Sequence, residues 1–372
     1  MGNGGNGSGV PELSTRLIVE TLLVVVLVVV AIYFLFPRLL GLGDAIGGLG
    51  SAKPGWIGVA IAFAIATFAT YIALFKSVVG GEDLPLRWAE AYQINMAALA
   101  ATRFFSAAGA GGVVLTYWAL AKAGMERREV GRRMSAFIVL QYAFYPLAII
   151  VFGILLRTGV LDGPNSVELT IVPAAIAGLV MAVGLLIVLV PGDLERRIGR
   201  MAQGSRHRLT FERIAKVPAT IADGVRVGLG LLTHPSRGGL AIIGAMGFWA
   251  ANIGILWASF KAFGISPPVA VLVQGFFIGM AANLLPFSPA GVGAVDAGMI
   301  GAFVLFGLPD AAVFSAILTY RLVAFWLPLP PGVIAFFQLR RRIGVWEVEG
   351  LPIARNRGPG GDRDRRRAII DS

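Results

Sequence analysis

Four ionisable side chains lie within segments that are otherwise apolar, and they are the residues best placed to do chemistry. They are Glu90, Arg103, Asp296 and Arg321. An arginine in hydrocarbon costs about 2.5 to 3.5 kcal/mol or more, so each must meet something anionic. The partner could be internal, with Asp296 or Glu90 locking helices together, or it could be a ligand phosphate, which the guanidinium fork binds well. Both hold if Asp296 balances one arginine and leaves the other for the ligand.

Polar neighbours could complete such a site. Tyr320 offers a hydroxyl beside Arg321, and Asp296 could instead receive a cationic group such as an amine. For each neutral polar side chain taken alone, a hydrogen bond between helices is the more common role. The predicted headgroup-binding residues are Arg103, Arg321, Tyr320, Asp296, Asn283 and Ser288, and a polar path could extend over Gln274, Asn252, Ser106 and Thr116.

The composition indicates a membrane protein and argues against most catalytic and metal chemistry. Of the 372 residues, 56% are hydrophobic and 14% are charged, whereas an average soluble domain has about 25% charged residues. There is no cysteine and there are two histidines, which rules out thiol nucleophiles and Cys/His zinc sites. We therefore expect no metal, no cofactor and no enzyme activity. The net charge of +11 comes from Lys and Arg between apolar segments, which is a topology signal and not a nucleic-acid footprint.

Six apolar runs are long enough to cross a bilayer, which takes about 20 residues at 1.5 Å rise each. Two further apolar stretches, 90–120 and 269–306, are broken in the middle by glycine and proline clusters, which stop an α-helix. We interpret each as a broken or re-entrant helical hairpin. The six spans are Leu17 to Phe36, Gly55 to Phe75, Met134 to Arg157, Glu168 to Val190, Gly238 to Phe260 and Ala311 to Leu339. The residues expected to break the hairpins are Gly111 and Gly112 in the first and Pro286, Pro289, Gly291 and Gly293 in the second.

The distribution of Lys and Arg predicts the topology, because short basic loops stay in the cytoplasm. Residues 122–133 carry five of them, the loop after Val190 is richer, and 340–342 are all arginine. Six spans and two hairpins satisfy these assignments with both termini cytoplasmic, as in a multi-pass protein of the cell membrane. The hairpins then enter from opposite sides, which predicts inverted repeats over 17–157 and 158–339 with a site near the midplane.

The predicted fold is therefore an all-α polytopic membrane protein of six spans and two hairpins. Residues 1–16 are expected to be a disordered N-terminus, and 340–372 a basic cytoplasmic tail. The basic link 191–237 has apolar residues at three- and four-residue spacing from Phe211 to Leu229, which predicts an amphipathic helix. That helix could lie on the inner leaflet or pack against the protein's own cytoplasmic face.

A pattern in the second half resembles a known family. It consists of a Leu-Pro, a Gly-x-Gly turn, an acidic residue, a Gly-x-Pro loop, Tyr-Arg and a Leu-Pro-rich end, in NLLPFSPAGVGAVDAGMIGAFVLFGLP and TYRLVAFWLPLPPGVIAF. This pattern is similar to the flippase-like family called the lysylphosphatidylglycerol synthase transmembrane region, and the resemblance extends from about Gly55 to Leu339. Asp296 stands where the family usually has Glu, and the first hairpin lacks the proline often found there.

The resemblance implies flipping of aminoacylated phosphatidylglycerol or of polyprenyl-phosphate-linked lipids. In two-domain members an aminoacyltransferase domain follows the membrane region, whereas this chain ends about 30 residues after its last predicted span. We therefore expect no lysyl transfer by this chain.

The leading hypothesis is a flippase or translocase that moves an anionic or aminoacylated phospholipid, or a polyprenyl-phosphate-linked lipid, between leaflets. Its partners would be membrane lipids, and it could form a homo-oligomer. One alternative is a membrane component of a polyprenyl-phosphate glycosyl transfer pathway, for which only Asp296 with Glu90 could supply the carboxylates. Another is a non-transporting subunit whose glycine-rich faces bind partner proteins, and in that case removing the arginines should impair folding and not flux.

Overall fold

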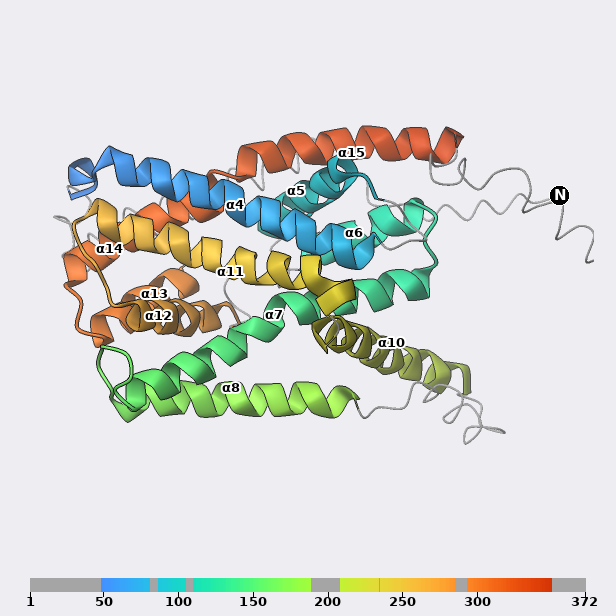
Figure 1. Ribbon diagram of the computed structural model, residues 1–372. Helices are drawn as coiled ribbons and strands as arrows, with labels where there is room; N and C mark the ends of the chain where they lie inside the picture. Colours follow the sequence, from blue (N-terminus) through green and yellow to red (C-terminus); the bar gives the residue numbers. More distant parts are fainter. Residues whose placement is uncertain are drawn as a thin grey trace, which may run out of the picture.

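The structure is a computed structural model that describes residues 48–80, 86–104, 110–188, 208–233, 235–284 and 293–349, and within them the regular structure is helical (Figure 1). Among these residues, five helical segments are long and apolar enough to cross a membrane. The predicted all-helical membrane architecture is thereby confirmed, while the predicted span from Leu17 to Phe36 lies outside the described residues. The five segments are α4 (Pro54–Val79), α7 (Arg127–Arg157), α8 (Val167–Val188), α11 (Pro235–Ala262) and the last span, which begins with α14 (Asp310–Arg321).

Helices α4 and α11 form an antiparallel pair at the centre of the molecule. The N–H of Lys53, just before α4, donates to the carbonyl of Ala262 at the end of α11 (3.0 Å). Glycines let the backbones approach: a Cβ on Gly244 would lie 2.8 Å from the Leu74 nitrogen, and one on Gly254 would lie 2.6 Å from the Phe63 ring. Small residues at a helix interface allow this close van der Waals packing in membranes, where no hydrophobic effect drives helices together.

Gly244→Ala is expected to destabilise the protein by about 1 to 3 kcal/mol, because the added methyl group meets the backbone of α4 and forces the helices apart. Gly239→Ala in the same helix is the matched control, since its added Cβ meets nothing within 4 Å and alanine favours helix by up to about 1 kcal/mol over glycine. Thermal unfolding of the purified variants in detergent measures the difference. Equal melting temperatures would contradict the close contact.

The two predicted hairpins are each built from a pair of short helices. The first consists of α5 (Trp88–Phe104) and α6 (Ala110–Lys122), and the second of α12 (Val269–Ala281), a 3₁₀ turn (Ala282–Leu284) and α13 (Ala294–Leu305). A 13-residue helix extends only about 20 Å, short of a hydrocarbon core of about 30 Å.

The residues expected to break the hairpins take different places. Gly111 and Gly112 lie in the first turn of α6 and not in the break, and Gly293 is the N-cap of α13 with φ of 83°. A Cβ on Gly112 would lie 2.6 Å from the Ala98 carbonyl oxygen, so this glycine allows α6 to pack closely on α5. The three remaining break residues, Pro286, Pro289 and Gly291, lie outside the described residues.

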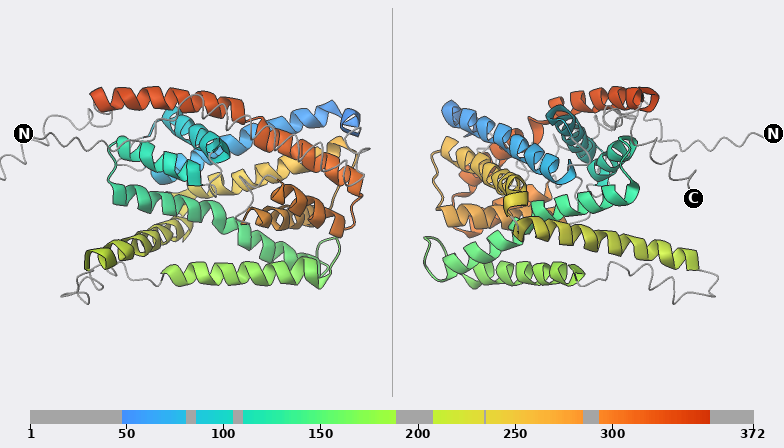
Figure 2. Two further views of the ribbon diagram at one scale, coloured as in Figure 1. Left: turned by 180° about the vertical axis from the view of Figure 1, so that it is seen from behind. Right: turned by 45° about the vertical axis from the view of Figure 1, so that its right-hand side comes forward.

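The hairpins begin at opposite ends of the central pair, because one follows the end of α4, the other follows the end of α11, and these helices are antiparallel (Figures 1 and 2). Each hairpin also packs on a span from the other half of the chain. Helix α5 lies against α15 (Leu329–Glu349), and α12 lies against α7. The two halves are therefore interlocked through their hairpins.

The last span is interrupted, although the sequence predicted one continuous helix from Ala311 to Leu339. Helix α14 ends at Arg321, a π-helical turn follows over Leu322–Trp326, and α15 begins at Leu329. Pro328 stands between the π turn and α15, and proline removes a backbone donor and clashes with the preceding turn. A π turn in a membrane helix is typical of a functional site.

Helix α10 (Arg208–Thr233) packs with its second half against α7. A Cβ on Gly224 would lie 2.6 Å from the Arg132 carbonyl oxygen, and one on Gly228 would lie 3.2 Å from that of Ala136. For this part of the amphipathic link, the contact is with the protein itself. The side chains of 208–219 lie outside the described residues.

Candidate functional site

The ends of three helices meet at one cluster of charged side chains. Arg103 stands one residue before the end of α5, Asp296 lies in the first turn of α13, and Arg321 is the last residue of α14. Arg321 lies 11 residues into its helix, which places it about 17 Å from the start of the span and near the middle of a hydrocarbon core of about 30 Å. Irregular backbone at that depth is tolerated where it packs in protein or lines a wet cavity.

Arg103 binds the backbone of the π turn. Its guanidinium donates hydrogen bonds to the carbonyl oxygens of Phe325 and of Ala324, the latter at 3.2 Å, and stands 4.2 Å from the centroid of the Phe325 ring. The Ala324 carbonyl is available as an acceptor because Pro328 has no N–H with which to close the helical bond to it. Arg103 thus joins the first hairpin to the interrupted span of the other half.

Arg321 and Asp296 form a buried ion pair. The Nε of Arg321 donates to Oδ1 of Asp296, and both side chains are less than a tenth exposed. The other carboxylate oxygen, Oδ2, accepts the N–H of Gly293 (2.9 Å) and so caps α13. Asp296 therefore has two roles. It pairs with Arg321, and it caps the N-terminus of α13.

Two arginines and one aspartate are the charged side chains of this cluster among the described residues. Arg103 and Arg321 share one aromatic ring, since Arg321 stands 5.3 Å from the centroid of Phe325, and the Asp296 carboxylate is paired with Arg321. Among the described side chains, none with a negative charge lies within ion-pair distance of Arg103. Glu90 does not serve, because it accepts the N–H of Arg87 (3.0 Å) and caps α5 about 20 Å away along the helix.

Of the other predicted site residues, some lie at the cluster and others lie away from it or outside the described residues. The hydroxyl of Tyr320 points to Oδ1 of Asn252 (3.5 Å), which brings α11 to the cluster. Asn283 is exposed in the 3₁₀ turn and has no contact that ties it to Arg103 or Arg321, and Ser288 lies outside the described residues. In the predicted polar path, Gln274 donates to Leu169 on α8 (3.2 Å), Thr116 donates to the Gly112 carbonyl within α6 (2.8 Å), and Ser106 lies outside the described residues.

Phe325 is the site residue that sequence reasoning missed. It lies four residues after Arg321, a spacing that puts both on one helix face, and it receives both guanidinium groups. The run Phe-Trp-Leu-Pro-Leu-Pro-Pro was the available signal, because three prolines within four residues leave carbonyls without helical donors.

The arrangement suits binding of an anion. Arg103 has five N–H donors and uses two on the π turn, which leaves donors for an oxyanion such as a phosphate. In the described residues no three His, Cys, Asp or Glu side chains group as they would around a metal ion.

Comparison with known proteins supplies the context for this geometry. A sequence model of the family described as Lysylphosphatidylglycerol synthase TM region matches residues 21–332. Curated relatives include proteins called UPF0104 membrane protein from Methanothermobacter thermautotrophicus. One is 30% identical over 91 residues, which is 24% of this chain and 26% of the relative, and a second is 29% identical over 86 residues, which is 23% and 26%. The matched segments thus span about a quarter of the length of these curated relatives.

Proposed function

Because the chain belongs to the family of the lysylphosphatidylglycerol synthase transmembrane region, we propose that it moves an anionic or aminoacylated phospholipid, or a polyprenyl-phosphate-linked lipid, between the leaflets of the membrane. The observation that carries the proposal is Arg103, which lies beside the ion pair of Arg321 and Asp296 and has no carboxylate within ion-pair distance among the described side chains. An uncompensated guanidinium in hydrocarbon is costly, and a lipid phosphate is the anion most available there.

The roles of the two arginines differ in this proposal. Arg321 is neutralised by Asp296 and holds α13 against α14, so it positions the site. Arg103 binds two carbonyls and a ring but no carboxylate among the described residues, so it is the residue that would receive the phosphate. Tyr320 and Asn252 lie at the edge of the cluster and could hydrogen-bond the rest of the headgroup.

An inverted-repeat architecture gives this site a mechanism. Three features are those that an inverted repeat would produce. The hairpins start at opposite ends of the central pair, the two helices of that pair are antiparallel, and each hairpin packs against a span from the other half of the chain. In transporters of this plan the substrate binds near the midplane between discontinuous helices, and one repeat rocks against the other to open the site to each side in turn. The proposed topology is six spans and two re-entrant hairpins with both termini in the cytoplasm.

Reconstitution identifies the lipid. Purified protein in liposomes is given headgroup-labelled phosphatidylglycerol, aminoacyl-phosphatidylglycerol, polyprenyl phosphate or phosphatidylcholine, and the labelled lipid that reaches the inner leaflet is measured against protein-free liposomes. We expect transfer of at least one of phosphatidylglycerol, aminoacyl-phosphatidylglycerol and polyprenyl phosphate. We expect little transfer of phosphatidylcholine. Transfer of none of them by folded protein would contradict the flippase and favour the non-transporting subunit.

A further inference from the structure

One side of α4 is exposed along most of the helix. Its exposed positions recur at three- and four-residue spacing, so they lie along one face. A Cβ on Gly55 or on Gly58 would meet nothing within 4 Å, so no contact among the described residues requires glycine there. The first half of α4 lies at the edge of the molecule, beyond the end of α15 (Figures 1 and 2). We call this side the outer face of α4, and its residues are Gly55, Gly58, Ala62, Ile65 and Ala69.

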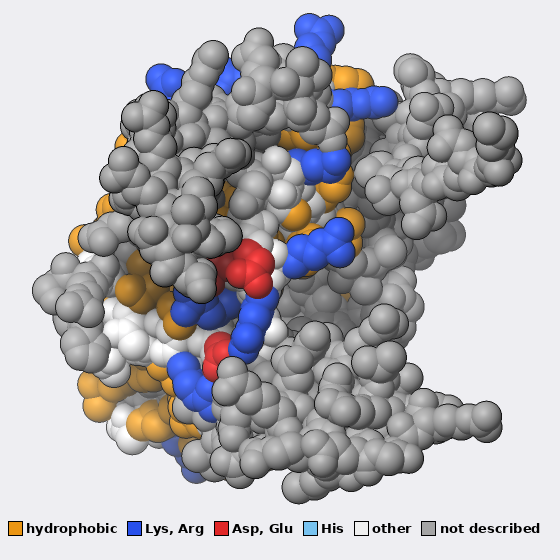
Figure 3. All heavy atoms as spheres, turned by 90° about the vertical axis from the view of Figure 1, so that its right-hand side faces the viewer, with side chains coloured by type: hydrophobic (Ala, Val, Ile, Leu, Met, Phe, Trp, Pro, Cys, Tyr) orange, Lys and Arg blue, Asp and Glu red, His pale blue; other side chains and the backbone are white. Residues whose placement is uncertain are grey.

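The outer face leads to a lysine. Lys76 follows Ala69 by seven residues, which puts it on the same side of the helix. It lies toward the end of the molecule at which Lys and Arg side chains gather (Figure 3). Its ammonium stands 5.1 Å from the ring centroid of Trp88, and no carboxylate of the described side chains lies within ion-pair distance of it.

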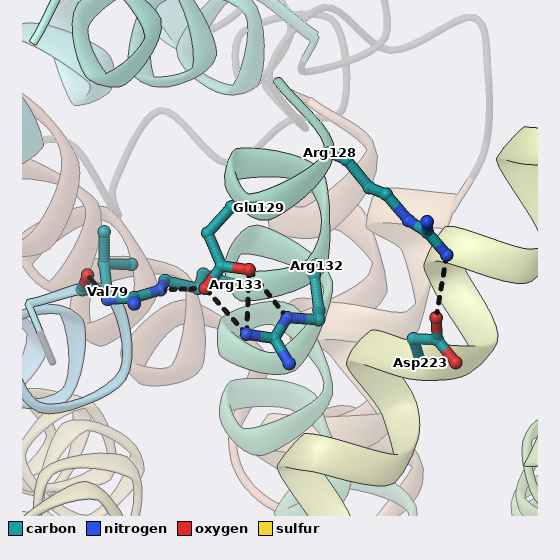
Figure 4. A network of polar contacts seen from close by, with 6 residues as sticks. All are labelled: Val79, Arg128, Glu129, Arg132, Arg133 and Asp223. Atoms are coloured by element: carbon teal, nitrogen blue, oxygen red, sulfur yellow. Dashed lines mark hydrogen bonds and ion pairs between the residues drawn. The ribbon is translucent and has the colours of Figure 1, made fainter. Parts of the chain in front are cut away.

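The acidic side chain at this end of α4 is engaged elsewhere. Arg133 of α7 donates to the carbonyl oxygen of Val79 at the end of α4 (2.7 Å) and to the carboxylate of Glu129 (2.5 Å), which also accepts from Arg132 (Figure 4). These contacts fix the end of α4 on α7. A carboxylate for Lys76 would therefore have to come from another segment.

The apolar run 17–36 is the segment that the chain brings closest to this face. It lies outside the described residues, and residues 37–47 join it to the 3₁₀ turn Gly48–Ser51 that precedes α4. Eleven residues of helix extend only about 16 Å, and irregular backbone does not cross hydrocarbon exposed to lipid. A span over 17–36 would therefore run antiparallel to α4, and consecutive elements are usually neighbours in space.

The run matches the outer face in charge and in size. Its one charged residue is Glu20, and a carboxylate in a membrane segment needs a cation. When Glu20 is set level with Lys76, an antiparallel helix brings a large side chain opposite a small one at each further level, and small residues are what lets membrane helices pack closely. The opposed pairs are Leu27 with Ala69, Ala31 with Ile65, and Phe34 with Ala62.

We propose that the run 17–36 forms a helix that packs antiparallel on the outer face of α4, with Glu20 paired to Lys76. The short link 37–47 holds the run near this face at an effective concentration of about a millimolar or more, which favours it over a second copy of the chain. The contact adds a third helix to the central pair of α4 and α11. It does not depend on the proposed transport activity.

Disulfide cross-linking tests the contact, because the chain has no cysteine of its own. Leu27→Cys with Ala69→Cys is made in the full chain with a protease site in the link 37–47, oxidised in the membrane and then cleaved. We expect the two fragments to stay joined until they are reduced. The yield should be about tenfold higher than for the matched pair Val25→Cys with Ala69→Cys, because Val25 lies on the opposite side of the run and a disulfide needs Cα atoms within about 7 Å.

Charge reversal tests the register. Glu20→Lys should lower the yield of the Leu27 to Ala69 disulfide about fivefold, because two like charges then face each other. Adding Lys76→Glu should restore the yield. Adding Lys53→Glu should not restore it, since Lys53 lies at the opposite end of α4.

Three results would overturn the proposal. Equal yields from Leu27 and Val25 would mean that the run is not held on the outer face. Disulfide-linked dimers in place of joined fragments would mean that a second copy covers the face. A higher yield with Ile334→Cys, which is exposed on α15, would place the run on the last span. If the first cysteine pair does not fold, Phe34→Cys with Ala62→Cys decides at another level of the same face.

Discussion

Arg103→Gln is expected to reduce transfer of the anionic lipid about 10- to 100-fold while transfer of phosphatidylcholine stays at its low level. The reason is that a hydrogen bond to a charged group contributes about 1.5 to 3 kcal/mol, and about 1.4 kcal/mol corresponds to a factor of ten. Glutamine keeps an amide NH₂ group that can donate to the carbonyls of the π turn, so the variant removes the charge and most of the fork but not the whole contact. Initial rates in liposomes of matched protein density measure the effect.

Two companion variants serve as controls. One separates the effect of the positive charge from that of the planar guanidinium fork, and the other separates an effect at the site from an effect of losing a surface charge. Arg103→Lys keeps the charge but not the planar fork, so its transfer rate should lie between those of the wild type and Arg103→Gln. Arg157→Gln makes the same chemical change at the exposed end of α7, where the side chain donates to the Asn165 carbonyl (2.8 Å), and it should leave transfer unchanged. Undiminished transfer of the anionic lipid by folded Arg103→Gln would remove Arg103 from the substrate site.

The long spans were predictable from the sequence because their length follows from composition. The runs from Gly55, Glu168 and Gly238 match α4, α8 and α11 to within a few residues at each end, since an apolar segment of that length must be helical in hydrocarbon whatever it packs against. The break in the last span escaped prediction. Its apolar character continues through the π turn and Pro328, so hydrophobicity alone does not reveal that the α-helix is interrupted there.

The charged residues of the candidate site could be predicted from the sequence, but their partners could not. The sequence left open whether Asp296 or Glu90 pairs with an arginine, and the structure selects Asp296 with Arg321. Glu90 is instead a helix cap, a role that its place three residues after Arg87 could have indicated. The partners of Arg103 are two backbone carbonyls and a phenylalanine ring, and such contacts follow from tertiary packing, which no spacing of charged residues encodes.

The buried pair of Asp296 and Arg321 carries the second large prediction. Asp296→Asn is expected to destabilise the protein by about 3 to 5 kcal/mol, because it removes one charge of a buried ion pair and leaves the other buried. Asparagine retains an oxygen that can accept the N–H of Gly293, so the cap of α13 survives and the loss reports the charge. Asp310→Asn, the same change at the exposed start of α14, should cost only the few tenths to about 1 kcal/mol of a charge at a helix N-terminus.

Removing both charges tests whether the pair is a unit. The double variant Asp296→Asn with Arg321→Met is expected to be more stable than Asp296→Asn alone, because a well-packed neutral pair costs less than one buried charge left without its partner. The free energies of unfolding in detergent of the wild type, Asp296→Asn, Arg321→Met and the double variant give the coupling energy between the two residues directly. Additive losses would mean that the two residues act independently.

The double variant should also keep part of its transport, since the pair positions the site and Arg103 is the residue proposed to bind the phosphate. Complete loss of transport in a stable double variant would instead place Arg321 in contact with the lipid.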